Sequence, residues 1–249
     1  MPSRPVRAKA ARGKRPAAAA PAAPATARAP ATGSVPTSSS TPPPPATLHL
    51  TLVTLPAGRA LHRVHQAKYL PAQFNPGVAG NARFSPIVDA AGQPIPTLYA
   101  GTTLACALME SVFHDVPFTA GFKIVEKTRL AGQVHATLRT REPLRLVDLA
   151  SVPLRKLGIT RKQLIDTEKD QYPATRRWAE AIHRHCAEAQ GLTWVSRQDD
   201  RARAYVFFGD RVPAAALDAT AAPRSLTGDV AAYTEVLDLA EQIGVNVVV

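Results

Sequence analysis

The sequence predicts one compact α+β domain of residues 48–249, preceded by a disordered tail of residues 1–47. Strand-like runs outnumber helical patterns and do not alternate regularly with them, which favours an α+β domain over a doubly wound one. The sequence contains no internal repeat. The chain beyond the tail has the length of a single domain with a sizeable core.

The tail is predicted from its composition, which differs from that of the remaining chain. Residues 1–47 hold 14 Ala, 11 Pro and seven Lys or Arg, without any Asp or Glu. Large apolar residues are too few there to offset the entropy of ordering the segment. The tail carries seven of the +11 net charges, which leaves +4 for the domain. Such a segment weakly attracts nucleic acid or acidic membranes, but a solubilising or linker role is favoured.

Targeting signals are not expected in the tail. A secretory signal needs a continuous apolar stretch, and prolines interrupt the alanine-rich run of residues 17–31. The tail is rich in arginine and lacks acidic residues, as in organelle transit peptides, but its prolines argue against the amphipathic helix that those peptides form.

The first half of the domain is expected to hold three strands and one helix. The strands are expected at Leu48–Leu55, Leu61–His65 and Thr97–Ala100, with a proline- and glycine-rich loop at 70–96 before the third. Thr102 or Thr103 is expected to cap the helix that follows. Its apolar stripe at Leu104, Leu108 and Val112 leaves Glu110 well outside the apolar face.

The second half continues with strands, two helices and a C-terminal helix–strand unit. Strands are expected within 121–130 and 132–140 and at Leu144–Ala150, 192–196 and 204–210. Thr160 is expected to cap a short helix through Ile165, and a longer helix is expected at Thr175–Gln190 with Gly191 as its stop. The last segment, 233–249, predicts a helix, a glycine stop and a short strand.

Several kinds of site are not expected. The sequence has no phosphate-binding loop, dinucleotide fingerprint or zinc-ligand spacing. His183, His185 and Cys186 resemble a metal cluster, but residues two apart on a helix point in different directions, so no metal site is expected. Cys106 and Cys186 are isolated thiols, typical of a reducing compartment such as the cytoplasm. No run of about 18 apolar residues predicts a membrane span.

Five residues could together form a catalytic site for a nucleotide substrate. Arg63 and Arg83 lie on or beside loops, and arginine binds phosphates through its planar fork of donors. Tyr99 ends a strand and could stack on a flat ring. Glu110 could stabilise a positively charged sugar intermediate. Ser196, just before a polar turn, could supply an orienting hydrogen bond. A nucleotide sugar with a departing base would use all of these groups.

Each of the five residues also has an ordinary structural interpretation. Arg63 could pair with a carboxylate on a strand face, and Arg83 could be a charge on a loop surface. Tyr99 could belong to the core, and Ser196 could only cap the polar turn that follows it. Glu110 could be a solvated surface glutamate, because unpaired glutamate is almost never fully buried.

The order and setting of these residues resemble the RES domain family, the toxins of bacterial toxin–antitoxin systems. The similar segments are "HRVH" around Arg63, "GNARFSP" around Arg83, "PTLYAGTTLACALMESVFHDV" around Tyr99 and Glu110, and "GLTWVSRQ" around Ser196, followed by "AYVFFGDR". The resemblance spans roughly residues 60–212 and leaves out the tail.

The resemblance implies a fold related to that of ADP-ribosyltransferase toxins and an enzyme that cleaves NAD between nicotinamide and ribose. NAD would be a substrate rather than a cofactor, and inorganic phosphate, water or a protein would accept the ADP-ribose. Arg83 and Arg63 would hold the phosphates, and Tyr99 would pack against the nicotinamide–ribose end. Glu110 would stabilise the ribosyl cation, and Ser196 would form a hydrogen bond near the nicotinamide.

Two departures from the family pattern concern the loop that carries Arg83. The family often has Gly-Arg-Trp where this chain has Ala82-Arg83-Phe84, which puts the position of Arg83 in question. The segment "VDAAGQPIP" between Arg83 and Tyr99 is long, so substrate access could differ.

The resemblance also implies a partner, an antitoxin with a helix-turn-helix module that covers the active site. Homo-oligomers and hetero-oligomers are both compatible with the sequence. Two alternatives to NAD cleavage remain. One is transfer of ADP-ribose to a protein target. The other is a non-enzymatic module that binds nucleic acid through the basic tail, although the modest charge of the domain weighs against direct nucleic-acid binding.

Overall fold

β-Branched and aromatic runs of the chain form a mixed sheet in the computed structural model, which describes residues 40–249. The expected disorder of residues 1–39 lies outside the described residues. The strands are β1 (Leu52–Leu55), β2 (Ala60–Gln66), β3 (Ile87–Val88), β4 (Pro94–Ile95), β5 (Thr97–Gly101), β6 (Lys123–Glu126), β7 (Gln133–Thr140), β8 (Leu144–Asp148), β9 (Gly191–Val195), β10 (Arg203–Phe208), β11 (Leu217–Ala219), β12 (Arg224–Ser225) and β13 (Val245–Val248). The helices are α1 (Leu104–Met109), α2 (Ser151–Leu157), α3 (Arg161–Leu164), α4 (Tyr172–His185) and α5 (Val230–Gln242), with 3₁₀ turns η1 (Lys127–Leu130) and η2 (Lys169–Gln171).

The main sheet has nine strands, in the order β1-β8-β9-β10-β5-β2-β7-β11, with β12 also paired to β7. All of its neighbouring pairs are antiparallel except β8 and β9. Parallel neighbours need a long crossover, and α2, α3 and α4 supply it between these two strands. Two small sheets, β13-β6 and β3-β4, complete the strand pairing. The expected α+β fold is confirmed.

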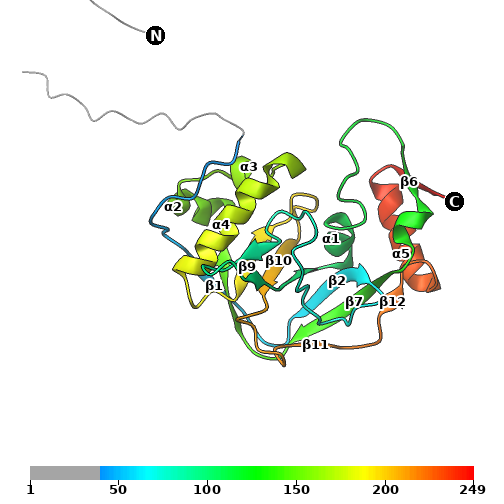
Figure 1. The fold of residues 1–249 in the computed structure, drawn as a ribbon. Coiled ribbons are helices and arrows are strands. Elements are labelled where there is room, and N and C mark those ends of the chain that lie inside the picture. The colour runs from blue at the N-terminus through cyan, green and yellow to red at the C-terminus, as the bar shows by residue number, and fades with distance from the viewer. Residues whose placement is uncertain (1–39) are drawn as a thin grey trace, which may run out of the picture. The chain divides into compact units, whose positions relative to one another are not determined.

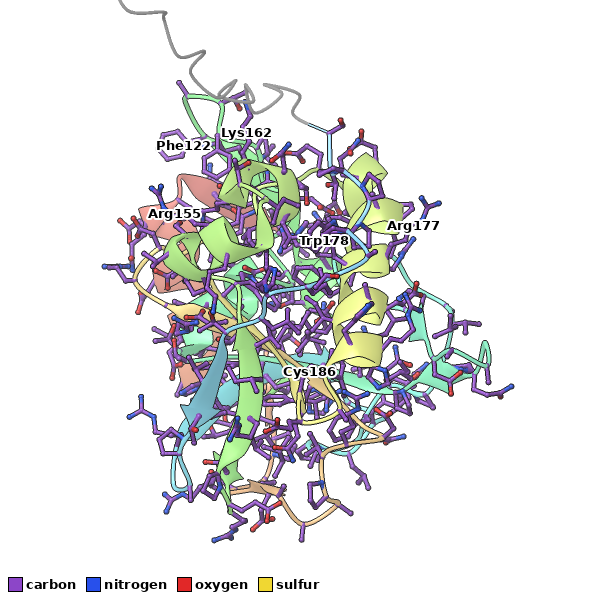
Figure 2. The ribbon with its side chains drawn as sticks, turned by 90° about the vertical axis from the view of Figure 1, so that its left-hand side faces the viewer. Phe122, Arg155, Lys162, Arg177, Trp178 and Cys186 are labelled. Atoms are coloured by element: carbon purple, nitrogen blue, oxygen red, sulfur yellow. The ribbon has the colours of Figure 1, made fainter. Side chains whose placement is uncertain are left out.

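The helices lie in two groups over the sheet, and each group covers its own core cluster (Figure 1). The helices α2, α3 and α4 pack over β9 and β10, around the fully buried Trp178 and Trp194. Figure 2 shows Trp178 on the inner side of α4 and Arg177 on its outer side. Helices α1 and α5 pack around Phe113 and Leu130 in a second cluster. The candidate site lies where these two groups face each other.

Most expected elements are present, and the differences concern helix ends, one additional helix and four short additional strands, β3, β4, β11 and β12. Thr103 caps α1, and Thr160 caps α3 through a capping box, both as expected. Helix α4 begins and ends earlier than expected, and Gly191 opens β9 instead of stopping a helix. Helix α2 was not predicted from the sequence.

The long helix ends early because a distant arginine caps it. The guanidinium of Arg211 donates hydrogen bonds to the carbonyl oxygens of His183, Cys186 and Ala189, at 2.6, 2.6 and 3.0 Å. These bonds satisfy carbonyl groups that a continuing helix would otherwise pair.

The described end of the expected tail packs on the domain, so ordered structure begins before residue 48. Thr41 is buried and donates its hydroxyl to the carbonyl of Gln163 at 2.5 Å. The carbonyl of Pro42 accepts a hydrogen bond from the indole N–H of Trp178 at 2.7 Å. The carbonyl of Ala46 lies 3.1 Å from a ring nitrogen of His185. The carbonyl groups of Pro42 and Ala46 thus lie within hydrogen-bonding distance of side chains on α4, a role that composition does not indicate.

A protein that begins at Leu48 should therefore be less stable than one that begins at Ser40. The shorter protein leaves the indole N–H of Trp178 buried without its acceptor, which costs about 1–3 kcal/mol. Urea denaturation of both proteins measures the difference. Introducing Trp178→Phe into both proteins is the control, and it should reduce the difference between their free energies of unfolding. Equal stability of the two truncated proteins would show that residues 40–47 contribute nothing.

Candidate active site

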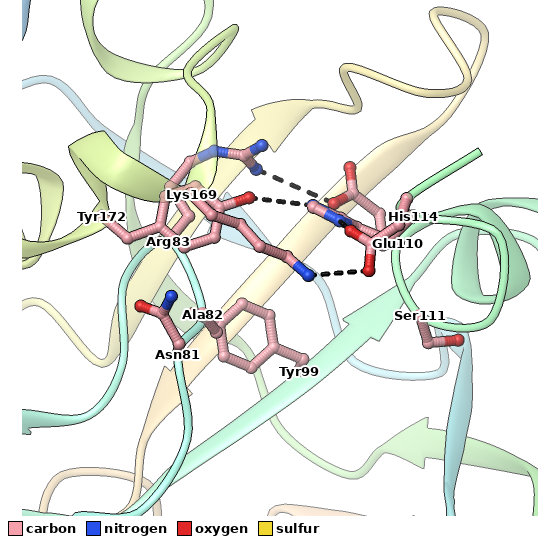
Figure 3. Close-up of a pocket in the computed structure, with 10 residues that line it drawn as sticks. Asn81, Ala82, Arg83, Tyr99, Glu110, Ser111, His114, Lys169 and Tyr172 are labelled. Carbon is pink, nitrogen blue, oxygen red and sulfur yellow. Dashed lines mark hydrogen bonds and ion pairs between the residues drawn. The ribbon is translucent and has the colours of Figure 1, made fainter. Parts of the chain in front are cut away.

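A cavity of about 320 Å³ opens between two walls that come from distant parts of the chain. One wall consists of the Arg83 loop, the turn η2 and the start of α4, and the other consists of the end of α1 and the turns after it. The lining residues are Asn81, Ala82, Arg83, Tyr99, Glu110, Ser111, His114, Asp115, Lys169 and Tyr172. Figure 3 shows three interactions that cross between the walls. The cavity thus brings together three of the five residues that the sequence singled out.

Glu110 reaches the cavity because α1 is short. The helix ends at Met109, so Glu110 is its C-cap residue and lies just beyond the last turn. The helix lies close to β5 because Gly101 has no side chain, and a Cβ there would be 2.8 Å from the sulfur of Cys106. The side chain of Glu110 is 16% exposed, so it is neither a solvated surface glutamate nor a core residue.

Ser196 holds the carboxylate of Glu110 from behind. Its fully buried hydroxyl donates a hydrogen bond to Oε1 of Glu110 at 2.6 Å. The same oxygen accepts hydrogen bonds from the backbone N–H groups of Gln198 and Asp199, at 3.0 and 3.1 Å. Both backbone bonds orient the hydroxyl proton toward Glu110. Ser196 therefore caps the polar turn and also positions the carboxylate.

Arg83 is buried opposite Glu110 without a full set of partners. Its side chain is 3% exposed, and its Nη1 lies 3.7 Å from Oε2 of Glu110. Its Nε and Nη2 have no hydrogen-bond partner within residues 40–249. The backbone of the residue is held by Thr175 on α4, whose hydroxyl donates to the Arg83 carbonyl. Buried donors of a charged group are costly when they are unpaired, so this guanidinium is suited to an anionic ligand.

Tyr99 connects the floor of the cavity to the Arg83 loop. Its phenol oxygen accepts a hydrogen bond from the backbone N–H of Phe84 at 3.0 Å. Its ring packs edge-on against Trp194, with 6.3 Å between the ring centroids. Burial raises the pKa of Tyr99 to about 12, so the phenol stays protonated at neutral pH. Tyr99 is therefore both a wall of the cavity and a support for the Arg83 loop, even though Ala82 replaces the family glycine.

Arg63 lies beside the main cavity rather than in it. Its Nη1 donates hydrogen bonds to the carbonyl oxygens of Pro71 and Gln73, at 2.6 and 2.8 Å. Burial lowers its pKa to about 10, which still leaves it charged at neutral pH. The structure therefore uses Arg63 to hold the loop of residues 71–73, and no carboxylate pairs with it among the described ion pairs.

The sheet opens next to Arg63, and smaller cavities extend the site there. Strands β2 and β5 are joined through a single residue pair, His62 and Gly101, and they separate beyond it. Cavities of about 50 and 250 Å³ lie at this opening, and both are lined by Arg63 and Tyr99. The larger one also shares Asn81 and Ala82 with the main cavity, so the three spaces meet around Tyr99.

Four polar residues of the cavity were not predicted as site residues. The hydroxyl of Tyr172 lies 2.9 Å from Nε2 of His114, and Nδ1 of His114 lies 2.8 Å from Oδ1 of Asp115. The amine of Lys169 donates to Oδ2 of Asp115 at 2.7 Å. His114 and Asp115 lie in the segment "FHDV", so the family motif contained them. Lys169 and Tyr172 come from a segment without any motif, and only the fold brings them to the site.

Residues 40–249 contain no group of three or more His, Cys, Asp or Glu side chains that could hold a metal ion. His183 instead pairs with Asp210 at 2.8 Å. Across the same residues, no helix has the length and apolar character needed to cross a membrane.

Comparison with known proteins identifies one family and one related fold. A family model described as the RES domain matches residues 60–229. The solved "crystal structure of the M. tuberculosis MbcT-MbcA toxin-antitoxin complex" contains a chain with a TM-score of 0.51 and 14% sequence identity, covering 73% of this chain and 90% of that one. At this identity the likeness shows the fold alone. No curated protein matches the chain significantly.

Replacing Tyr99 by phenylalanine should destabilise the domain, although the ring remains. The variant removes the acceptor of the Phe84 N–H, and Phe84 is fully buried, so we expect a loss of about 1–3 kcal/mol. Denaturant unfolding checks this. Tyr69→Phe is a matched control on a partly exposed tyrosine and should change stability by less than about 0.5 kcal/mol. Equal effects of the two substitutions would contradict the supporting role.

Proposed function

Because the chain belongs to the RES domain family, we propose that it is the toxin of a toxin–antitoxin pair and that it cleaves NAD between nicotinamide and ribose. The family membership rests on a model that spans residues 60–229 and includes the motifs around Arg63, Arg83, Glu110 and Ser196. The reaction and its substrate are inferred from the chemistry of the cavity.

The buried guanidinium of Arg83 is the observation that carries the proposal. It is a cation with two nitrogen atoms, Nε and Nη2, that have no partner among residues 40–249, and it lies beside a carboxylate at the edge of a cavity. A phosphate oxygen would satisfy these donors in the planar arrangement that arginine favours. The diphosphate of NAD offers such oxygens, and the ribose attached to it would then be directed toward Glu110.

The size of the site supports a dinucleotide. The main cavity of about 320 Å³ is small for NAD alone, but the smaller cavities beside Arg63 adjoin it around Tyr99. Arg63 keeps its charge while holding the loop of residues 71–73, so it contributes positive potential along this path. An extended ligand with two anionic groups suits this arrangement better than a compact one.

Glu110 supplies the charge that the bond cleavage requires. When the bond between C1 of the ribose and the nicotinamide nitrogen breaks, both electrons leave with the nicotinamide, which departs neutral. The ribosyl group is left as a cation, and a nearby carboxylate stabilises it. Ser196 fixes one oxygen of Glu110 at 2.6 Å, which keeps the carboxylate oriented before the reaction. An acceptor oxygen then bonds to the cationic carbon.

The acceptor and the partner are parts of the same proposal. Inorganic phosphate, water or a protein side chain could supply the attacking oxygen, and phosphate or water gives a soluble product. The related solved structure is a toxin–antitoxin complex, which supports an antitoxin partner, proposed to carry a helix-turn-helix module. The proposed setting is the bacterial cytoplasm, where NAD is available and loss of NAD harms the cell.

Two other functions have less support. Transfer of ADP-ribose to a protein would use the same residues and differs only in the acceptor. Binding of nucleic acid would depend on the basic tail, most of which lies outside the described residues. The orphan donors of Arg83 beside Glu110 favour an enzyme over a binding module.

The Glu110→Gln variant should release nicotinamide from NAD about 10²–10³-fold more slowly than the wild type, because glutamine keeps the shape but loses the charge. Nicotinamide is quantified with and without inorganic phosphate, and phosphate dependence identifies the acceptor. Glu188→Gln, on an exposed glutamate, is the matched control and should not change the rate. A Glu110→Gln variant that releases nicotinamide as fast as the wild type would contradict the proposed role of Glu110.

Arg83→Met should separate stability from activity. The substitution removes the buried unpaired donors, so the free energy of unfolding should stay the same or rise by about 1 kcal/mol. Nicotinamide release should fall by about 100-fold. Chemical denaturation and the NAD assay measure the two effects, with Arg177→Met on the outer side of α4 as the control. A large loss of stability would mean that Arg83 is a structural residue.

A further inference from the structure

Three interactions cross the cavity, and two of them connect residues that the proposed reaction does not use. Arg83 faces Glu110, Tyr172 faces His114, and Lys169 faces Asp115 (Figure 3). Tyr172, the first residue of α4, is 2% exposed. The Tyr172–His114 contact is therefore a partly buried hydrogen bond at the side of Arg83.

The hydrogen bonds of this group have a definite direction when His114 is neutral. Asp115 accepts from Lys169 and lies 2.8 Å from Nδ1 of His114, so the ring carries its proton on Nδ1. Nε2 of His114 is then an acceptor, and Tyr172 donates its hydroxyl proton to it. Burial raises the pKa of Tyr172, and the nearby Arg83 partly offsets this, so the phenol keeps the proton that it donates.

The ring of Tyr172 in turn supports the guanidinium of Arg83. The central carbon of that guanidinium lies 5.5 Å from the centroid of the Tyr172 ring, within the range of a cation–π interaction. Thr175, one turn later on α4, donates its hydroxyl to the Arg83 carbonyl and also lies 3.1 Å from the Tyr172 carbonyl. One turn of helix thus fixes both the backbone and the charged end of Arg83.

We propose that Tyr172, His114 and Asp115 form a positioning chain that holds the Arg83 guanidinium in the orientation needed to bind the substrate's phosphates. The phosphate part of this inference rests on the proposed function. Without the chain, the Arg83 guanidinium loses its support on the side away from Glu110. It would then turn toward the carboxylate, whose Oε2 is only 3.7 Å from Nη1, and its free donors would be lost to the ligand.

A simpler interpretation is that the positioning chain only stabilises the fold by joining the two walls of the cavity. In that case, removing the positioning chain would lower the stability of the protein without changing the affinity of the folded protein for a ligand. Affinity and KM therefore separate the two interpretations. ADP-ribose is a suitable probe because it keeps the diphosphate and both riboses but lacks the bond that reacts.

The test measures ADP-ribose binding by calorimetry, steady-state NAD cleavage and urea denaturation for four variants. Tyr172→Leu removes the ring, Tyr172→Phe keeps the ring but removes the hydroxyl, His114→Phe removes the acceptor, and the fourth variant combines the last two. Tyr233→Leu is the matched control, because Lys127 lies 4.5 Å from the centroid of that tyrosine ring and neither residue lines the cavity.

Tyr172→Leu should weaken ADP-ribose binding about tenfold and raise the KM for NAD in proportion, with a smaller change in kcat. Tyr172→Phe and His114→Phe should each weaken ADP-ribose binding about threefold. The double variant should bind no more weakly than either single variant, because both substitutions remove the same hydrogen bond. Tyr233→Leu should bind as the wild type does.

Each alternative outcome has a distinct meaning. Unchanged ADP-ribose affinity in folded Tyr172→Leu, or additive effects in the double variant, overturns the positioning chain. A wild-type protein that binds ADP-ribose but releases no nicotinamide overturns the proposed reaction, but it does not contradict the positioning chain. A wild type that binds no ADP-ribose and cleaves no NAD overturns both.

Discussion

A buried cation with too few partners is the constraint on which the arrangement of the site depends. The guanidinium of Arg83 is almost fully removed from water, yet two of its nitrogen atoms have no partner among the described residues. Such a group destabilises a fold unless its surroundings fix it strongly. The first turn of α4 holds it through Tyr172 and Thr175, and Glu110 supplies the opposite charge. In the proposed function, an anionic ligand would supply the partners that this guanidinium lacks.

The sheet and the short helix place the other groups around this cation. Helix α1 ends after six residues, so Glu110 lies at its C-terminal end, beside the cavity. Gly101 allows the helix to lie close to β5. Ser196 follows β9 and uses the turn before β10 to direct its hydroxyl. Since β2 and β5 pair at one position only, the sheet leaves room beside Tyr99. The candidate binding and catalytic groups therefore lie on strand ends and helix ends supported by a rigid core.

The sequence predicted the residues that meet at this site better than it predicted their partners. Ordered motifs pointed to Arg83, Tyr99, Glu110 and Ser196, and the fold brings these four together. Their partners were harder to foresee, because Tyr172 lies in a segment without a motif and meets His114 only through the tertiary structure.

The same limit applies to the secondary structure. Periodicity and capping residues found most strands and the start of α3. The end of α4 depends on Arg211, far along the chain, which a local pattern cannot contain. Helix α2 carries Pro153 in its first turn, which resembles loop punctuation although a helix tolerates proline there.

The pairing of β6 with β13 links the site to the order in which the chain is made. The cavity wall that carries His114 and Asp115 runs from α1 to β6, and β6 is paired along its length with the C-terminal strand. Ribosomes deliver the N-terminal parts of a chain first, and those parts begin to fold first. A nascent chain that already holds Arg83, Glu110 and Ser196 still lacks the strand that anchors this wall. The wall of the candidate site that carries His114 and Asp115 is therefore anchored only after β13 has been made.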